Sequence, residues 1–232
     1  MKFLKKFATR AEYEAYMATN VNYPFVGYIK DEGKVEYSAE RIYEFFNILR
    51  GDGKAYIKTN YYMSNYDRIT VNFNKSEVTE NLLGFKSTLF TAAILPTQSS
   101  KGYVAWQNDA TLLQLSNGEV SLGMYESGGI YAAKLVSGAG TFNVNNYRTA
   151  PTEVVSAFPL YVFAANQKDS FDIDTRFYTG GISYITITDS RTGEVKLDLR
   201  PAVMNGAKAG MMDMVTSIFY GNANSEGAFT AE

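Results

Sequence analysis

Carboxylates are the side chains of this sequence with the most capacity for chemistry, because it contains no histidine and no cysteine. That absence excludes a Ser-His-Asp triad, a thiolate nucleophile, disulfides and cysteine-ligated zinc. Asp172 and Asp174 are two residues apart, so in a strand they share one face and could bind calcium or serve a glycosidase as acid and nucleophile. Their alternation with Phe171 and Ile173 favours instead the solvated face of a strand.

Glu119 and Glu126 are the other two carboxylates that a glycosidase would have to use. No aspartate stands between them, and no carboxylate pair in the sequence has an apolar setting that would raise a pKa for acid chemistry. The segment 51–54 contains two glycines and a lysine but lacks the spacing of a phosphate-binding loop. We therefore predict no enzyme, no catalytic residue, no metal and no cofactor.

Aromatic side chains are the alternative source of function, since they make up 15% of the 232 residues. Trp106 could stack on a sugar ring, although a lone tryptophan in a strand is more often buried in a core. Tyr61, Tyr62 and Tyr66 lie beside asparagines, a mixture typical of recognition surfaces. The strand propensity of tyrosine is the simpler explanation for these three. All four aromatic residues are candidates for binding a glycan.

Composition narrows the classes of partner. The net charge is -2, and lysines gather only at Lys2, Lys5 and Lys6, so we expect no nucleic-acid surface. The hydrophobic fraction of 46% is that of a globular protein. No apolar stretch approaches the ~20 residues of a membrane-spanning helix, and the start does not resemble a signal peptide. We expect synthesis in the cytoplasm and no membrane insertion.

The first fifty residues differ from the rest of the sequence. Thr9 and Glu12 have the spacing of a capping box, which predicts the start of a short helix. The segment 25–37 predicts a small hairpin with Gly33 in its turn. The apolar segment 42–49 fits a helix or a strand equally well, and the glycines that follow it suggest a boundary after residue 53.

A short helix and one hairpin cannot bury enough apolar surface by themselves. We therefore expect residues 1–53 to pack on the rest of the chain, on another copy or on another protein. A segment for anchoring and oligomerisation, which uses the last two, is our prediction. The expected assembly contacts are the apolar residues Phe3, Leu4, Phe7, Tyr13, Tyr16 and Phe25.

Residues 54–232 have the pattern of an all-β domain. Ile69, Val71 and Phe73 alternate with polar residues, as in a half-buried strand. The segment 112–122 predicts a hairpin, because Asn117-Gly118 suits a type I′ turn, and a meander continues to residue 147. Similar strands with regular turns predict an antiparallel sandwich.

The end of the sequence resembles concanavalin A-like jelly-roll domains, of the lectin and glucanase type, from structural proteins of phages and prophages of gut bacteria. The resemblance extends over about residues 54–230. It is carried by the segments 55–61, 158–166, 181–187, 199–203, 209–223 and 226–229. A weaker similarity joins residues 8–15, 26–29 and 35–37 to short leaders of virion proteins from such phages.

This resemblance implies a jelly-roll sandwich with a small N-terminal helix-plus-hairpin attachment. It implies a non-enzymatic place in a virion, as a head-fibre, tail-fibre or capsid-decorating subunit whose sandwich faces outward and touches host glycans. The implied partners are other virion proteins and further copies, with a trimer as the expectation from phage fibres. The glucanases of this fold carry a Glu-x-Asp-x-(x)-Glu run that this sequence lacks. A free-standing carbohydrate-binding module and a two-carboxylate glycosidase are the alternatives.

Overall fold

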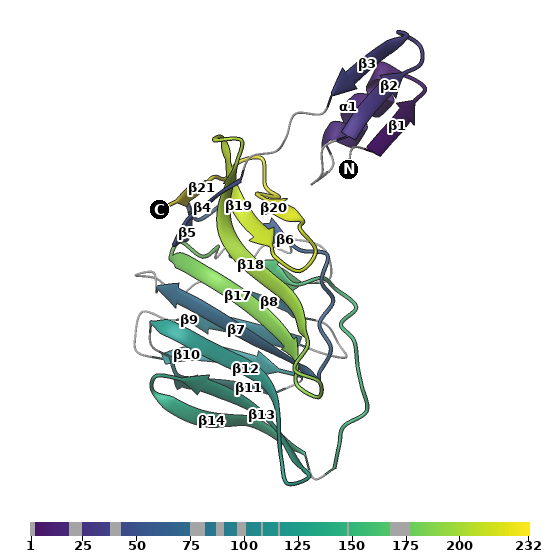
Figure 1. Cartoon of the computed structure of the whole chain (residues 1–232). Helices are drawn as coiled ribbons and strands as arrows, with labels where there is room; N and C mark the ends of the chain where they lie inside the picture. Colours follow the sequence, from purple (N-terminus) through teal and green to yellow (C-terminus); the bar gives the residue numbers. More distant parts are fainter. Residues whose placement is uncertain are drawn as a thin grey trace.

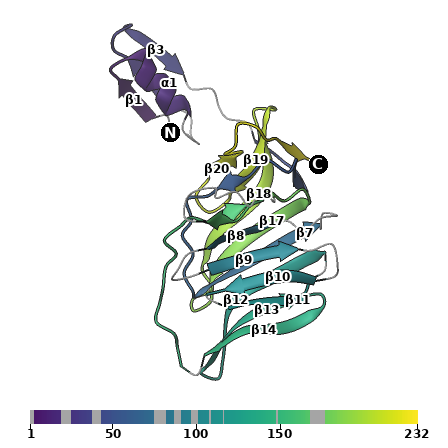
Figure 2. The ribbon, with the colours of Figure 1, turned by 180° about the vertical axis from the view of Figure 1, so that it is seen from behind.

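A computed structural model of the chain describes residues 3–18, 25–37, 43–74, 82–86, 91–96, 101–107, 109–115, 117–147, 149–167 and 177–232. Two sheets stack as an antiparallel sandwich, and a third, small sheet belongs to a separate N-terminal module (Figures 1 and 2). The all-β antiparallel sandwich predicted from the sequence is confirmed. No helix in the described ranges is both long and apolar enough to span a bilayer.

The N-terminal module comprises the described residues between 3 and 37, and in both views it lies apart from the sandwich. Its elements are β1 (Phe3–Phe7), α1 (Arg10–Ala18), β2 (Phe25–Ile29) and β3 (Lys34–Tyr37). The strands follow the order β1-β2-β3, with β1 parallel and β3 antiparallel to β2. The predicted helix and hairpin are therefore confirmed, whereas β1 and its parallel pairing were not foreseen.

Local hydrogen bonds explain where α1 begins. The Glu12 N–H donates to the Thr9 hydroxyl at 3.3 Å, and the Ala8 N–H donates to the Glu12 carboxylate at 2.7 Å. The first bond satisfies a donor that the first helical turn leaves open, and the second ties the Glu12 side chain to the residue before the N-cap. In the hairpin, Gly33 has φ +61°, a conformation that favours glycine.

The larger sheet comprises eleven strands among the described residues. Eight follow the order β14-β13-β12-β7-β17-β18-β19-β20, and the short strands β4, β5 and β21 pair beside them. The bounds are β4 (Tyr43–Phe45), β5 (Leu49–Gly51), β7 (Asp67–Asn74), β12 (Gly118–Ser127), β13 (Ile130–Ser137), β14 (Gly140–Tyr147), β17 (Gly181–Asp189), β18 (Val195–Met204), β19 (Lys208–Asp213), β20 (Phe219–Gly221) and β21 (Phe229–Ala231).

The smaller sheet comprises seven strands among the described residues, in the order β11-β10-β9-β8-β15-β6, with β16 parallel to β8. The bounds are β6 (Ile57–Lys58), β8 (Leu83–Lys86), β9 (Thr91–Pro96), β10 (Lys101–Trp106), β11 (Asp109–Gln114), β15 (Tyr161–Val162) and β16 (Asn166–Gln167). One apolar core joins the two sheets, because inward residues such as Val71 of β7 and Ile94 of β9 belong to the same buried cluster.

Strands β4 and β5 resolve the open question about residues 42–49. β4 pairs with β18, and β5 pairs with β17 and β21, so the described part of this segment forms two short strands joined by residues 46–48 and contains no helix. The predicted boundary after residue 53 assigns these strands to the N-terminal segment, but their hydrogen bonds place them in the larger sheet. β18 tolerates Pro201 because the neighbour of β18 on one side changes at this residue, from β17 before it to β4 after it.

The predicted hairpin over 112–122 is wrong. β11 pairs with β10 in the smaller sheet, whereas β12 pairs with β7 and β13 in the larger sheet. The turn that contains Asn117 and Gly118 therefore carries the chain from one layer to the other. Two apolar strands beside a glycine turn suit either arrangement locally, and the packing of whole sheets decides between them. The meander β12-β13-β14 and the β17–β18 hairpin agree with the prediction.

Candidate functional site

The predicted aromatic candidates separate on burial. Trp106 is fully buried in the core between the sheets, so its proposed contact with a sugar is wrong: burial of a large aromatic side chain outweighs exposure. Tyr66 is 7% exposed, and Tyr61 is half-buried. Tyr62 is 49% exposed, which makes it the most exposed of the four residues.

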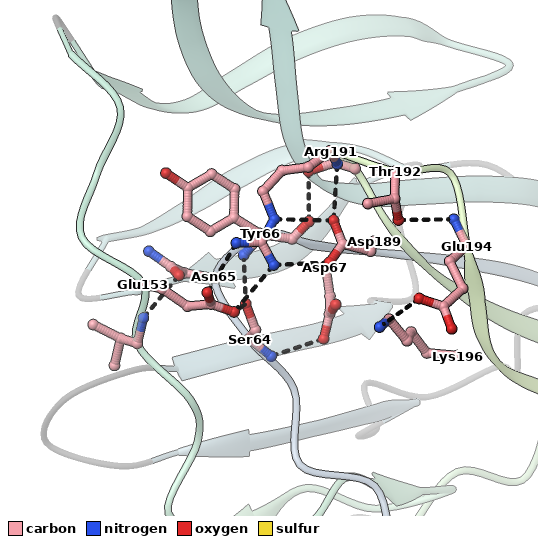
Figure 3. Close-up of polar contacts among 12 residues, drawn as sticks. Ser64, Asn65, Tyr66, Asp67, Glu153, Asp189, Arg191, Thr192, Glu194 and Lys196 are labelled. Carbon is pink, nitrogen blue, oxygen red and sulfur yellow. Dashed lines mark hydrogen bonds and ion pairs between the residues drawn. The ribbon is translucent and has the colours of Figure 1, made fainter.

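Tyr66 belongs to a polar cluster where three segments meet at the end of the larger sheet (Figure 3), and Tyr61 joins this cluster through its hydrogen bond to Asp67. Residues 61–67 lead into β7, residues 151–156 pass beside them, and the β17–β18 turn closes over both. The Ser64–Val155 bridge and a 2.7 Å bond from the Ser156 N–H to the Met63 carbonyl join the first two segments. We call this group the Arg191 cluster after its central residue.

The Arg191 guanidinium links the three segments. Its Nη2 lies 2.8 Å from Asp189 Oδ2, and its Nη1 lies 2.8 Å from Glu153 Oε2. Its central carbon is 4.4 Å from the ring centroid of Tyr66, whose hydroxyl donates to the Pro151 carbonyl at 2.6 Å. Planar stacking and paired hydrogen bonds are contacts that arginine makes and lysine does not.

A third carboxylate, that of Asp67, lies beneath these contacts, and Asp67 pairs in register with Asp189. Asp67 is 2% exposed, and it accepts bonds from the Ser64 N–H at 2.7 Å and from the Tyr61 hydroxyl at 2.8 Å. Asn65 adds two bonds to the neighbouring segment, to the Thr152 carbonyl and from the Val154 N–H. Buried polar groups at this end of the sandwich are thus bonded to the protein itself.

The two aspartates titrate in opposite directions. Hydrogen bonds from Arg191 lower the pKa of Asp189 to about 2, whereas burial raises the pKa of Asp67. Burial and the neighbouring Asp67 charge also raise the pKa of the Tyr61 phenol. A divergent carboxylate pair can serve acid–base catalysis. Here, however, Asp67 holds Ser64 and Tyr61, and Asp189 holds Arg191, so the cluster fastens loops together.

The other predicted carboxylates do not form a site in the described residues. Glu119 and Glu126 lie seven residues apart on β12, which is roughly 23 Å along a strand, far more than the ~5–10 Å between glycosidase carboxylates. The Glu119 carboxylate accepts a hydrogen bond from Tyr184. Asp172 and Asp174 lie outside the described residues. Within the described ranges, no group of three or more acidic residues could hold a metal ion.

The predicted assembly residues also have distinct environments. Phe7 and Tyr13 are buried within the N-terminal module together with Ile29, and Tyr16 packs against this cluster. The rings of Phe7 and Tyr13 meet edge to face at 5.3 Å between centroids. Phe7 and Tyr13 thus contact the module itself. The backbones of Phe3, Leu4 and Phe25 lie in β1 and β2, and their side chains are outside the described part.

Sequence reasoning missed the outer face of the larger sheet, the face turned away from the smaller sheet. Alternate residues of β7 point there, beginning with Arg68 and Thr70, while Ile69 is buried. The Thr70 and Ser121 hydroxyls lie 2.7 Å apart across β7 and β12, and the Arg68 guanidinium lies over Tyr125 of β12. Alternation in β7 indicates this polar face, but the neighbours on other strands follow from register alone.

The chain matches no protein-family model and no curated protein.

Proposed function

We propose that this chain is a non-enzymatic structural protein of a bacteriophage virion: a head-fibre, tail-fibre or capsid-decorating subunit. In this proposal the sandwich is a concanavalin A-like jelly roll that faces outward, and the N-terminal module anchors it to other virion proteins. The resemblance of the sequence supports this, and two of its segments, 181–187 and 199–203, lie on the central strands β17 and β18.

The observation that carries the proposal is the separate N-terminal module. It has its own small core of Phe7, Tyr13 and Ile29, distinct from the core of the sandwich. Figures 1 and 2 show it at one end of the molecule, away from both sheets. A small module whose described residues form their own core, separate from that of the sandwich, is available to contact a second copy or another protein. Closed symmetric assemblies are the rule for such subunits, and we propose a trimer.

A shortened chain tests the anchoring role. Residues 43–232 retain β4 and β5, which a cut after residue 53 would remove from the larger sheet. We expect the full chain to associate and the shortened chain to be monomeric, with the same thermal unfolding midpoint. Mass photometry measures association, and circular dichroism measures unfolding. An unchanged oligomeric state, or a shortened chain that no longer folds, would contradict the anchoring role.

A point variant provides the matched control for the truncation. Phe7→Ala removes a buried ring from the module and should cost it about 3–5 kcal/mol, more than so small a core can lose. We expect this full-length variant to lose association while the sandwich melts as in the parent. Lys30→Gln, an exposed change in the same module, should leave association intact.

Adhesion of the sandwich to host glycans is the second part of the proposal. A glycan array probed with residues 43–232 tests it, and binding without any assembly by the full chain would favour a free-standing carbohydrate-binding module instead. Turnover of a polysaccharide that is lost in Glu119→Gln or Glu126→Gln would favour the glycosidase. The ~23 Å between those residues along one strand argues against the latter.

A further inference from the structure

Two cationic side chains flank one tyrosine on the outer face of the larger sheet. The guanidinium carbon of Arg68 lies 4.0 Å from the ring centroid of Tyr125, and the Lys134 Nζ lies 5.8 Å from the same centroid. All three side chains are half-exposed. We propose that this group, the Arg68–Lys134 site, binds an acidic saccharide, that is, a sugar bearing a carboxylate or sulfate group.

Strand register creates space between the two cations. Gly123 of β12 pairs with Arg68 of β7 on one side and with Lys134 of β13 on the other. Because adjacent strands are ~4.8 Å apart, the Cα atoms of the two cationic residues are about 10 Å apart. A Cβ at Gly123 would meet the Asp67 carbonyl oxygen at 2.5 Å and the Arg68 Cα at 2.6 Å. The close approach of β7 therefore requires glycine at this position, and no side chain stands between the two cationic residues.

Neither cation has a carboxylate partner among the described residues. Arg68 donates one hydrogen bond, from Nη2 to the Met124 carbonyl at 3.3 Å, and its buried Nε has no acceptor within the described part of the chain. Lys134 makes its aromatic contact and no ion pair there. By contrast, Arg200 and Lys196 lie 2.8 Å from Asp198 and Glu194.

Positive charge with unused donors matches an oxyanion, because charge-assisted hydrogen bonds are about twice as strong as neutral ones. The nearest outer-face carboxylate on β12 belongs to Glu119, four residues from Gly123 and thus roughly 13 Å along the strand. That carboxylate already accepts a hydrogen bond from Tyr184. Burial and, to a smaller extent, the Glu119 charge raise the pKa of the Tyr125 phenol, so Glu119 is the acidic group with which an anion at this site would compete.

The surrounding groups favour a sugar as the carrier of the anion. The hydroxyls of Thr70 and Ser121 occupy the next outer positions on β7 and β12. The exposed amide of Asn143 lies opposite Lys134 on the edge strand β14. Hydroxyl and amide groups around an aromatic ring suit the alternating polar and apolar surface of a pyranose. This inference deepens the proposed glycan adhesion of the sandwich and rests on it.

Isothermal titration of the full chain with tetragalacturonate tests the site, and its fully methyl-esterified form provides a neutral ligand of the same shape. We expect the acidic form to bind at least tenfold more tightly and to weaken as salt is added. Lys134→Gln should weaken binding at least tenfold. Arg68→Lys, which keeps the charge but loses the planar guanidinium, should also weaken it. Lys208→Gln, an exposed change at the start of β19, should have no effect.

Several results would overturn the inference: no binding of tetragalacturonate at millimolar concentration, equal binding of the ester, or equal binding by Lys134→Gln. If sodium sulfate binds as tightly as tetragalacturonate, the ligand of the site is a free oxyanion and not an acidic saccharide. Lys134 is half-exposed, so its replacement should leave the melting curve unchanged, which circular dichroism verifies. Association measured by mass photometry does not depend on this site, and its failure would count against the anchoring role alone.

Discussion

Removing the Asp189 carboxylate should destabilise the sandwich in a pH-dependent way. Its pKa falls from 3.8 to about 2 in the folded chain, chiefly through hydrogen bonds from Arg191. At about 1.4 kcal/mol per pKa unit, this corresponds to about 2 kcal/mol of stability at neutral pH. The Arg191 side chain is 43% exposed, so solvent screening reduces the expected loss in Asp189→Asn to about 1–2 kcal/mol.

The sign of the pH dependence follows from the lowered pKa. A carboxylate with a folded-state pKa below its unfolded value stabilises the protein above pH ~4, and the contribution disappears as pH falls toward 2. Asp67 acts oppositely: burial raises its pKa, so its contribution is present at low pH and is lost as pH rises through the raised value. Comparing variant with parent at each pH largely cancels this opposite contribution.

Urea unfolding of the parent and Asp189→Asn at pH 7 and pH 3 measures the difference. We expect the loss at pH 3 to be about half of the loss at pH 7. Glu226→Gln removes an exposed carboxylate with no ion pair among the described residues. It should change the free energy of unfolding by no more than ~0.5 kcal/mol at either pH. A loss that is the same at both pH values would refute the assignment of Asp189 as the charged partner of Arg191.

Three further substitutions test other parts of the fold. Trp106→Ala should cost about 3–5 kcal/mol, measured by urea unfolding, because the ring is fully buried; a loss below 1 kcal/mol would contradict its place in the core. Gly123→Ala should lower the melting temperature, since its Cβ would meet backbone atoms at 2.5–2.6 Å. Asp213→Ala should cost about 2–4 kcal/mol, because the buried carboxylate accepts bonds from the Asp198 and Val215 N–H groups and the Thr216 hydroxyl, and an unchanged unfolding midpoint would exclude that role.

Local signals in the sequence predicted local structure well. The capping box at Thr9 and Glu12 marked the start of α1, and alternation at Ile69, Val71 and Phe73 identified β7 and its buried face. These patterns depend on residues close together in the chain, where the geometry of a helix or a strand is fixed by a few neighbours. The antiparallel sandwich followed from many such strands together.

Arrangements that depend on distant residues could not be predicted. The turn at Asn117 is locally compatible with a hairpin, and only sheet packing shows that it joins two layers. The contact of Arg191 with Glu153 spans 38 residues, and that of Arg68 with Tyr125 depends on the pairing of β7 with β12. Tyr61 and Tyr66 were predicted as glycan-binding candidates from their neighbours in the sequence, but the bond from the Tyr66 hydroxyl to the Pro151 carbonyl spans 85 residues and could not be foreseen.

The position of β7 has a consequence for synthesis on the ribosome. β7 is hydrogen-bonded to β12 on one side and to β17 on the other, and β17 begins more than 100 residues after β7 ends. At 5–20 residues per second, the nascent chain carries one unpaired side of β7 for roughly 5–20 s. During that interval the backbone groups of β7 that face β17 are open to pairing with other nascent chains. Slower translation before residue 181 should therefore increase misassembly, and chaperone demand should peak there.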